Sequence, residues 1–376
     1  MKRILLFVIL IFLSFFTFSQ KYSFIEGKTS IGKFVPHHRI MNELIDKTSF
    51  GFEVNYLTKN YSDKCYNKKY KFPYKGFGLS FYNLGNPEVF GYSFSAYGLM
   101  EFNLAKTPNF EFNIRSSSGL SYLTEKYDKD KNPYNVAIGT NINYLFTLGF
   151  NASYQFGNYS LLRLGADFMH NSNGSTRKPN LGVNQVFLSL SYSHLLLEKS
   201  EFKYSEYSRE RPSPHEIYTF ISFCTSDEYK EIPESRGGGF LCSSHSLAYN
   251  YQYSPIGKVG ASHDIFYNEN LYYYYDSERD SLMMRTDKFS EILKYGISFG
   301  HQLIFNRLEL TTFAGFYYYQ QVKKTENFYT RIGARYYLSD YLFINLTLRA
   351  FGFKAHFIES GIGVSFRKLS KTIDNW

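Results

Sequence analysis

A hydroxyl and an imidazole lie two positions apart in the stretch His170-Asn171-Ser172. A serine becomes a useful nucleophile when a neighbouring base takes its proton and a third group holds that base. The stretch ends an alternating run, 158–172, which is the pattern of a β-strand. Because side chains two apart on a strand share a face, we expect His170 and Ser172 to stand side by side.

Asn184 is the candidate for the third group. It lies at the end of the apolar stripe of the next alternating run, 183–196. If the two runs pair as a hairpin, Asn184 meets His170 and Ser172 on one surface. An amide at this position can accept a hydrogen bond from the far ring nitrogen of the imidazole or donate one to it.

The loop between the two runs is the candidate oxyanion site. Three of its residues have backbone or amide N–H groups that could face a reacting carbonyl oxygen: Asn173, Gly174 and Asn180. In known enzymes one such donor contributes about 10²–10³ in rate. The spacing alone also fits a polar strand end at the level of lipid head groups, so both interpretations stay open at this point.

Period-two patterning recurs along the rest of the chain. Eight runs precede a stretch at 197–214 that is dense in charge, Ser and Pro, and they lie near 22–34, 47–59, 71–84, 89–104, 109–123, 138–156, 158–172 and 183–196. Eight further runs follow, near 215–225, 239–253, 257–268, 289–306, 308–323, 327–337, 340–352 and 355–367. The predicted fold class is therefore all-β and antiparallel, with about 14–16 strands in total.

Composition separates a membrane barrel from a secreted β-sandwich. Aromatic residues make up 20% of the chain while its mean hydropathy is −0.33, as expected for strands with one apolar and one polar face. Charged residues such as Arg331, Arg335 and Glu359 fall on the polar faces, and charges are costly in a dry core. We therefore predict an outer-membrane-type transmembrane β-barrel whose apolar stripes, with His170 and Ser172 at a stripe's end, face lipid.

The first residues have the pattern of an export signal. Met1-Lys2-Arg3 is basic, and Ile4 to Leu13 is an unbroken apolar run. That run is shorter than the roughly 20 residues of a membrane-spanning helix. We therefore predict a signal peptide over residues 1–20, cleaved after Ser19 or Gln20, and localisation in the outer membrane.

Charge and cysteine content limit the partners. The net charge is +9, and in an exported chain this favours a phosphate-bearing membrane surface over nucleic acid. The three cysteines, Cys65, Cys224 and Cys242, form no disulfide framework, although the last two could pair in an oxidising compartment. The adjacent His37-His38 is a weak candidate for metal binding, and we predict no metal site and no cofactor.

Loop lengths suggest which side of the membrane the site faces. The turn at Gly157-Asn158 is short and the loop 173–182 is long, and outer-membrane barrels have short periplasmic turns and long external loops. This places the site in the outer leaflet. Two connections, 106–109 and 124–136, are expected to break this pattern.

The residues around the site resemble a known family. His170-x-Ser172-Asn173, then Pro179-Asn180-x-Gly182, then a polar residue two positions on, is similar to the lipid A 3-O-deacylase family. The resemblance implies an eight-stranded outer-membrane esterase with a lipid-facing site. It assigns Ser172 as nucleophile, His170 as general base and Asn180 as an oxyanion contributor. Asn184 departs from the family, because the acidic triad member is expected there.

The resemblance divides the chain and names a substrate. Residues 21–198 match the size of the family barrel, and residues 199–376 either continue one large barrel or form a second β-domain. The implied substrate is lipid A of lipopolysaccharide, from which an ester-linked acyl chain is hydrolysed. Two alternatives stay open: a non-catalytic barrel for transport or pore formation, and a phospholipase acting on glycerophospholipids. The sequence leaves the oligomeric state and the acyl position undetermined.

Overall fold

The computed structural model describes residues 21–36, 39–44, 48–61, 65–157, 160–198, 212–226, 239–276, 278–279, 281–322, 327–351 and 354–369. The expected signal peptide and the His37-His38 pair lie outside these residues, as does most of the polar stretch 197–214. The described chain contains two closed β-barrels, each of eight antiparallel strands. The all-β prediction is therefore confirmed.

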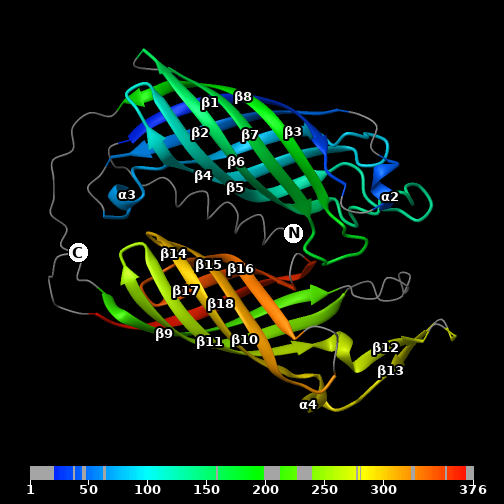
Figure 1. Ribbon diagram of the computed structural model, residues 1–376. Helices are drawn as coiled ribbons and strands as arrows, with labels where there is room; N and C mark the ends of the chain where they lie inside the picture. Colours follow the sequence, from blue (N-terminus) through cyan, green and yellow to red (C-terminus); the bar gives the residue numbers. More distant parts are fainter. Residues whose placement is uncertain are drawn as a thin grey trace. The chain divides into compact units, whose positions relative to one another are not determined.

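The first barrel is built from β1 to β8 in chain order (Figure 1). The strands are β1 (Lys21–Phe34), β2 (Ser49–Asn60), β3 (Tyr74–Asn83), β4 (Tyr92–Lys106), β5 (Phe110–Leu123), β6 (Ile142–Phe156), β7 (Ser160–Ser172) and β8 (Val183–Glu198). Pairing of β1 with β8 closes the sheet, so this barrel has no free strand edge. Two short helices, α2 (Arg39–Asn42) and α3 (Cys65–Lys69), lie in its connections.

The second barrel uses the later strands, and β18 pairs with β9 to close it. Its strands are β9 (Pro212–Ser226), β10 (Phe240–Ser254), β11 (Gly257–Asn268), β14 (Lys294–Phe305), β15 (Leu308–Gln320), β16 (Phe328–Tyr337), β17 (Leu342–Phe351) and β18 (Lys354–Leu369). The connection after β11 contains η1 (Glu269–Tyr272), the hairpin of β12 (Tyr273–Asp276) with β13 (Ser281–Met284), and α4 (Phe289–Ile292).

The strand total matches the prediction, and the second of the two predicted arrangements is the observed one. Sixteen strands form barrel walls, but they close as eight and eight and not as one large barrel. The division follows from hydrogen bonding, because β8 finds its second neighbour in β1 and leaves no edge for β9 to extend.

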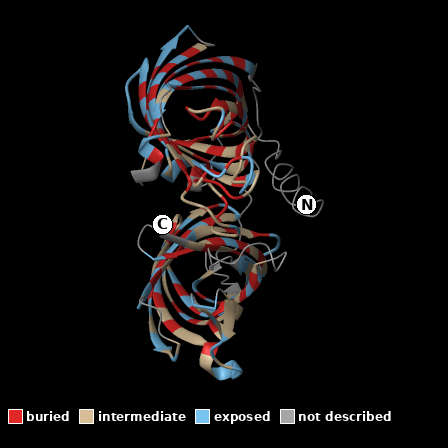
Figure 2. Cartoon of the chain, turned by 90° about the vertical axis from the view of Figure 1, so that its right-hand side faces the viewer, coloured by how far each residue is buried: buried red, intermediate tan, exposed pale blue. Residues whose placement is uncertain are grey.

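Both barrels turn their apolar stripes outward, as expected, and Figure 2 shows buried and exposed residues alternating along the strands. On β7, Leu162 and Leu164 are exposed while the intervening Arg163 is buried. On β8, Leu188 and Leu190 are exposed on either side of a buried serine. In a soluble protein such stripes would face the core, so their outward direction is that of a membrane barrel.

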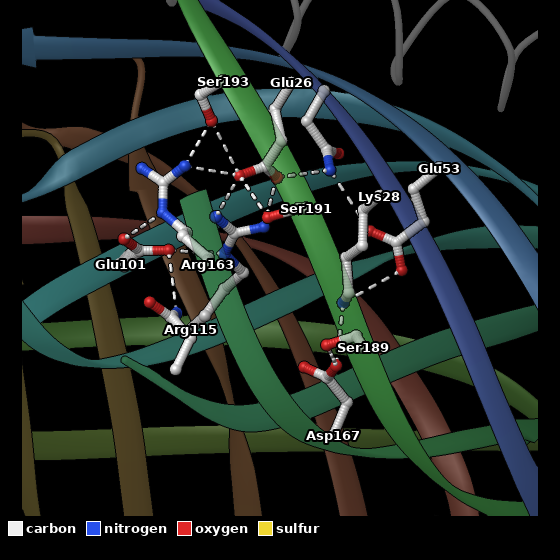
Figure 3. A network of polar contacts seen from close by, with 12 residues as sticks. Glu26, Lys28, Glu53, Glu101, Arg115, Arg163, Asp167, Ser189, Ser191 and Ser193 are labelled. Atoms are coloured by element: carbon white, nitrogen blue, oxygen red, sulfur yellow. Dashed lines mark hydrogen bonds and ion pairs between the residues drawn. The ribbon is translucent and has the colours of Figure 1, made fainter. Parts of the chain in front are cut away.

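Paired charges fill the interior of the first barrel (Figure 3). Glu26 lies between Arg115 and Arg163, with N–O distances of 2.6 and 2.7 Å. Arg115 also bonds Glu101 at 2.6 Å. Because each buried charge has an opposite charge beside it, the interior can be polar without a large desolvation penalty.

The second barrel has an interior of the same kind. Arg331 pairs with Asp264 at 3.0 Å and with Glu359 at 2.6 Å. Arg335, a further residue predicted to face inward, is 1% exposed. The predicted division between apolar outward and charged inward faces is therefore confirmed in both halves of the chain.

The positions of the connections correct one expectation. In the first barrel, the connections 35–48, 84–91, 124–141 and 173–182 all leave at one end, since each follows an odd-numbered strand. The short connections that follow β4 and β6 begin at the opposite end. The expectation that 106–109 and 124–136 break the pattern of short and long ends is therefore wrong. The connection that departs from this pattern is the one between β2 and β3, 61–73, which is long although it begins at the end with the short connections.

Two further observations concern the cysteines and the helices. Cys224 on β9 lies directly opposite Cys242 on β10, and both are free thiols. Within the described residues, every helix is too short or too polar to cross a membrane.

Candidate functional site

The β7–β8 hairpin brings the predicted base and its partner together. His170 on β7 is directly opposite Asn184 on β8. The His170 Nδ1 and Asn184 Oδ1 atoms are 2.5 Å apart. Because an amide oxygen only accepts hydrogen bonds, this contact places the imidazole proton on Nδ1 and leaves Nε2 as the basic nitrogen.

Ser172 stands two residues beyond His170, at the last position of β7. The two share the outward face with the exposed Leu162, Leu164 and Phe168. Both are partly buried, unlike the leucines of the same stripe. The predicted outward placement of hydroxyl and imidazole at the rim of the barrel is thus present in the structure.

The two asparagines of the loop contact one another. The backbone N–H of Asn173 donates to Asn180 Oδ1 at 2.9 Å. Asn173 is 2% exposed, so this bond ties the start of the loop to its far half. Since the oxygen of the Asn180 amide faces Asn173, its Nδ2 group is the part left to donate to a ligand.

Gly182 allows the loop to pack closely against the His170 imidazole. Its φ is +82°, in the region that favours glycine, and a Cβ built there would lie 2.8 Å from His170 Cε1. Its backbone N–H donates to the Ala137 carbonyl at 2.9 Å. The β5–β6 connection therefore supports the loop that borders the site.

The residues on β6 were missed by the sequence reasoning. Tyr144 is directly opposite Ser172, and Phe146 is directly opposite His170. Both face outward, and Tyr144 is less exposed than Phe146. Their alternate positions in the run 138–156, combined with antiparallel pairing of neighbouring runs, could have predicted that they lie beside Ser172 and His170.

Asp167 cannot replace the missing carboxylate of the site. It faces the barrel interior, where it pairs with Lys28 at 2.9 Å (Figure 3). It also accepts a hydrogen bond from Ser189 at 2.7 Å. The group that holds His170 is therefore the neutral amide of Asn184.

Fold and geometry together define a membrane-type β-barrel that presents a histidine, a serine and an asparagine on its outer surface. A family model described as "Lipid A 3-O-deacylase (PagL)" matches residues 50–193. A second, "Acyloxyacyl hydrolase, C-terminal domain", matches residues 215–368. These matches span most of the chain, which belongs to the lipid A 3-O-deacylase family, a family of hydrolases.

Solved structures with related folds are only distantly similar. Neisserial surface protein A is 9% identical, with 46% of this chain and 97% of that chain covered and a TM-score of 0.30. A Rhodopseudomonas blastica porin variant is 9% identical, covers 92% and 100%, and has a TM-score of 0.18. The Pseudomonas putida toluene transporter TodX is 10% identical, covers 95% and 91%, and has a TM-score of 0.17. A comparison with curated proteins gives no significant match.

Proposed function

We propose that this protein is an outer-membrane esterase that hydrolyses an ester-linked acyl chain of lipid A. The observation that carries the proposal is the contact of His170 Nδ1 with Asn184 Oδ1, two residues from Ser172 on the lipid-facing surface. The match of residues 50–193 to the deacylase family supports the same chemistry and the same substrate. A nucleophile on this face meets molecules dissolved in the membrane, and an acylated lipid is such a molecule.

The proposed reaction uses these groups in the roles that the family resemblance implies. His170 Nε2 takes the Ser172 proton as Oγ attacks the ester carbonyl, and the Asn180 amide donates to the oxyanion. The oxyanion collapses, the bond between the acyl carbon and the leaving alcohol oxygen breaks, and that oxygen receives the proton from His170. Water, deprotonated by His170, then cleaves the acyl-serine ester and releases a fatty acid, while Ser172 regains its proton.

Asn173 supports this chemistry in a different way from Asn180. Its backbone N–H is already bonded to Asn180 Oδ1, so it positions that amide. Asn184 fixes the imidazole tautomer but, being neutral, it cannot offset the charge of the imidazolium that forms. We therefore expect slower turnover than a carboxylate at this position would give.

The barrel supports a location of the site in the outer leaflet. The long connections 84–91, 124–141 and 173–182 leave at the end that carries the site, and such connections are external in outer-membrane barrels. The site then lies in the outer leaflet, where lipid A resides. This requires export, with a signal peptide over residues 1–20, a deacylase barrel over 21–198 and an adjoining C-terminal region over 199–376.

The interior of the first barrel argues against the pore alternative. A transport pore needs an open lumen, whereas Glu26, Arg115 and Arg163 pair across this one. A phospholipase has the same catalytic needs, so it differs only in substrate. A panel of lipid A and glycerophospholipids separates the two activities.

The test is the Ser172→Ala variant, expressed in cells whose lipid A is analysed by mass spectrometry. The active protein should produce lipid A that lacks one acyl chain, and the variant should not. Ser160→Ala is the matched control, because Ser160 begins the same strand on the outward face and bonds Tyr192 at 3.0 Å, at the opposite end. Identical lipid A from active and Ser172→Ala cells would refute the esterase.

A further inference from the structure

We propose that Lys33 binds a phosphate group of the lipid A head group while the acyl ester lies at Ser172. Lipid A is a phosphorylated sugar, so its recognition calls for a cation near the reacting ester. The inference rests on the proposed function and adds a head-group subsite to it. Four features of Lys33 support this proposal: its outward-facing position, its register with β8, its ammonium without a partner in the described residues, and its place near the rim of the barrel.

Lys33 interrupts an apolar stripe. On β1 the outward positions around it are Ile31, 61% exposed, and Val35, just past the strand end and 38% exposed. Lys33 itself is exposed on the same face. At the end of the first barrel that carries the site, it is the one charged side chain on an outward strand position among the described residues.

The register places Lys33 beside the site. β1 pairs with β8, so Lys33 is directly opposite Val186. The backbone N–H of Val35 donates to the Asn184 carbonyl at 2.7 Å. Lys33 and Asn184 are therefore diagonal neighbours, at about 7–8 Å in such a ladder. A lysine side chain spans most of that distance, so its ammonium can reach a group bound over Asn184.

The Lys33 ammonium has no hydrogen bond or ion pair within the described part of the chain. The inward lysines of the same barrel differ. Lys28 pairs with Glu53 at 3.3 Å and with Asp167 at 2.9 Å, and Lys59 pairs with Glu111 at 3.1 Å. A free cation on this surface is available to an anion that the protein itself does not supply.

The depth of Lys33 fits a head-group contact. It lies one residue before the end of β1, at the rim of the barrel. A charge on the lipid face is unfavourable at the bilayer centre and costs little near the interface. The aliphatic stem of lysine can lie along the apolar surface while the ammonium reaches the level of the phosphates.

Binding tests the subsite independently of turnover. Purified Ser172→Ala protein, which leaves the lipid intact, is titrated with lipid A and with the same lipid A after enzymatic removal of its phosphates. Adding Lys33→Gln should weaken binding of the phosphorylated lipid about tenfold and leave binding of the dephosphorylated lipid unchanged. Lys33→Arg should retain the preference for phosphate.

Lys75→Gln is the matched control, because Lys75 also lies on an outward position but at the opposite end of the barrel, on β3. It should bind both lipids as the parent protein does. Equal affinity of the parent and Lys33→Gln proteins for phosphorylated lipid A would overturn the inference. An equal loss of affinity of the Lys33→Gln protein for both lipids would also overturn it, because such a loss would indicate a general effect on the surface. The lipid A profile of Ser172→Ala cells tests the esterase separately.

Discussion

His170 and Asn184 face one another across β7 and β8, and their Nδ1 and Oδ1 atoms are 2.5 Å apart. The contact joins two strands within a closed sheet, so the orientation of the imidazole is set by backbone register and does not depend on a mobile loop. It also fixes the tautomer in which Nε2 is the unprotonated nitrogen and can accept the Ser172 proton. The reactivity expected of Ser172 therefore depends on the contact between His170 and Asn184.

The Asn184 amide should be functional but not optimal. Asn184→Glu should raise kcat by about tenfold or more, since a carboxylate stabilises the imidazolium that forms as Ser172 attacks. Asn184→Leu should lower kcat by about 100-fold, because Nδ1 would lose its acceptor. Rates of fatty acid release from lipid A by the purified proteins provide the measurement. Unchanged activity in Asn184→Leu would show that this contact does not orient the base.

Gly182→Ala should impair activity through steric contact with the base. The new Cβ would lie 2.8 Å from His170 Cε1, so the ring or the loop must move. Gly157→Ala is the control, since Gly157 also has a positive φ, +63°, but its added Cβ would have nothing within 4 Å. Both variants should lose similar stability from backbone strain, about 1 kcal/mol, in thermal unfolding. Only Gly182→Ala should lose about tenfold or more in kcat, and equal losses in the two would contradict a steric effect on His170.

Glu26 should stabilise the first barrel without acting in the reaction. It is fully buried and neutralises Arg115 and Arg163. Glu26→Gln removes one of the two carboxylates beside these guanidinium groups and leaves them only Glu101. Breaking such a buried pair costs about 3–5 kcal/mol. Thermal or denaturant unfolding should show this loss, and Glu88→Gln, at an exposed loop position, should show almost none. The folded fraction of Glu26→Gln should keep its specific activity.

Asp128 should make the β5–β6 connection resistant to mild acid. It accepts hydrogen bonds from the backbone N–H groups of Asp130 at 3.0 Å and Lys131 at 2.9 Å, which lower the pKa of Asp128. A lowered folded-state pKa gives stability that is present above the unfolded pKa and is lost as pH falls through the folded value. The protection of the Asp130 and Lys131 amides, which is the exchange rate of an unfolded chain relative to their own at the same pH, should therefore fall only below the pH at which ordinary aspartates protonate.

The control for this titration is Asp128→Asn, whose amide oxygen accepts the same bonds without titrating. The protection of the two amides should then become insensitive to pH in this acid range. A fall in protection in the parent protein at the ordinary pKa of aspartate would show that the turn does not perturb Asp128.

Strand parity was sufficient to predict the outward faces and much of the site. The two-residue spacing of His170 and Ser172, and the position of Asn184 at the edge of the next stripe, follow from the period of a strand and pairing of successive runs. The structure places all three on the outward surface. The catalytic roles assigned to them come from the family resemblance and stay predictions.

Other features depend on contacts that the sequence does not display. Closure into two barrels rests on pairing of β1 with β8, residues far apart in the chain. The pairing of Glu26 with Arg115 spans 89 positions and arises only when the sheet curls. The hydrogen bond from the Gly182 N–H to the Ala137 carbonyl depends on the conformation of a long connection, and strand periodicity gives no information about such a segment.

Labelling with a lipophilic fluorophosphonate tests the central claim most directly, because only an activated serine reacts with this probe. The purified protein is treated in detergent and digested, and the modified peptide is located by mass spectrometry. The adduct should lie on Ser172, disappear in His170→Ala and persist in Ser160→Ala. Absence of an adduct on Ser172 in the parent protein, or equal labelling in His170→Ala, would contradict an activated serine at this site.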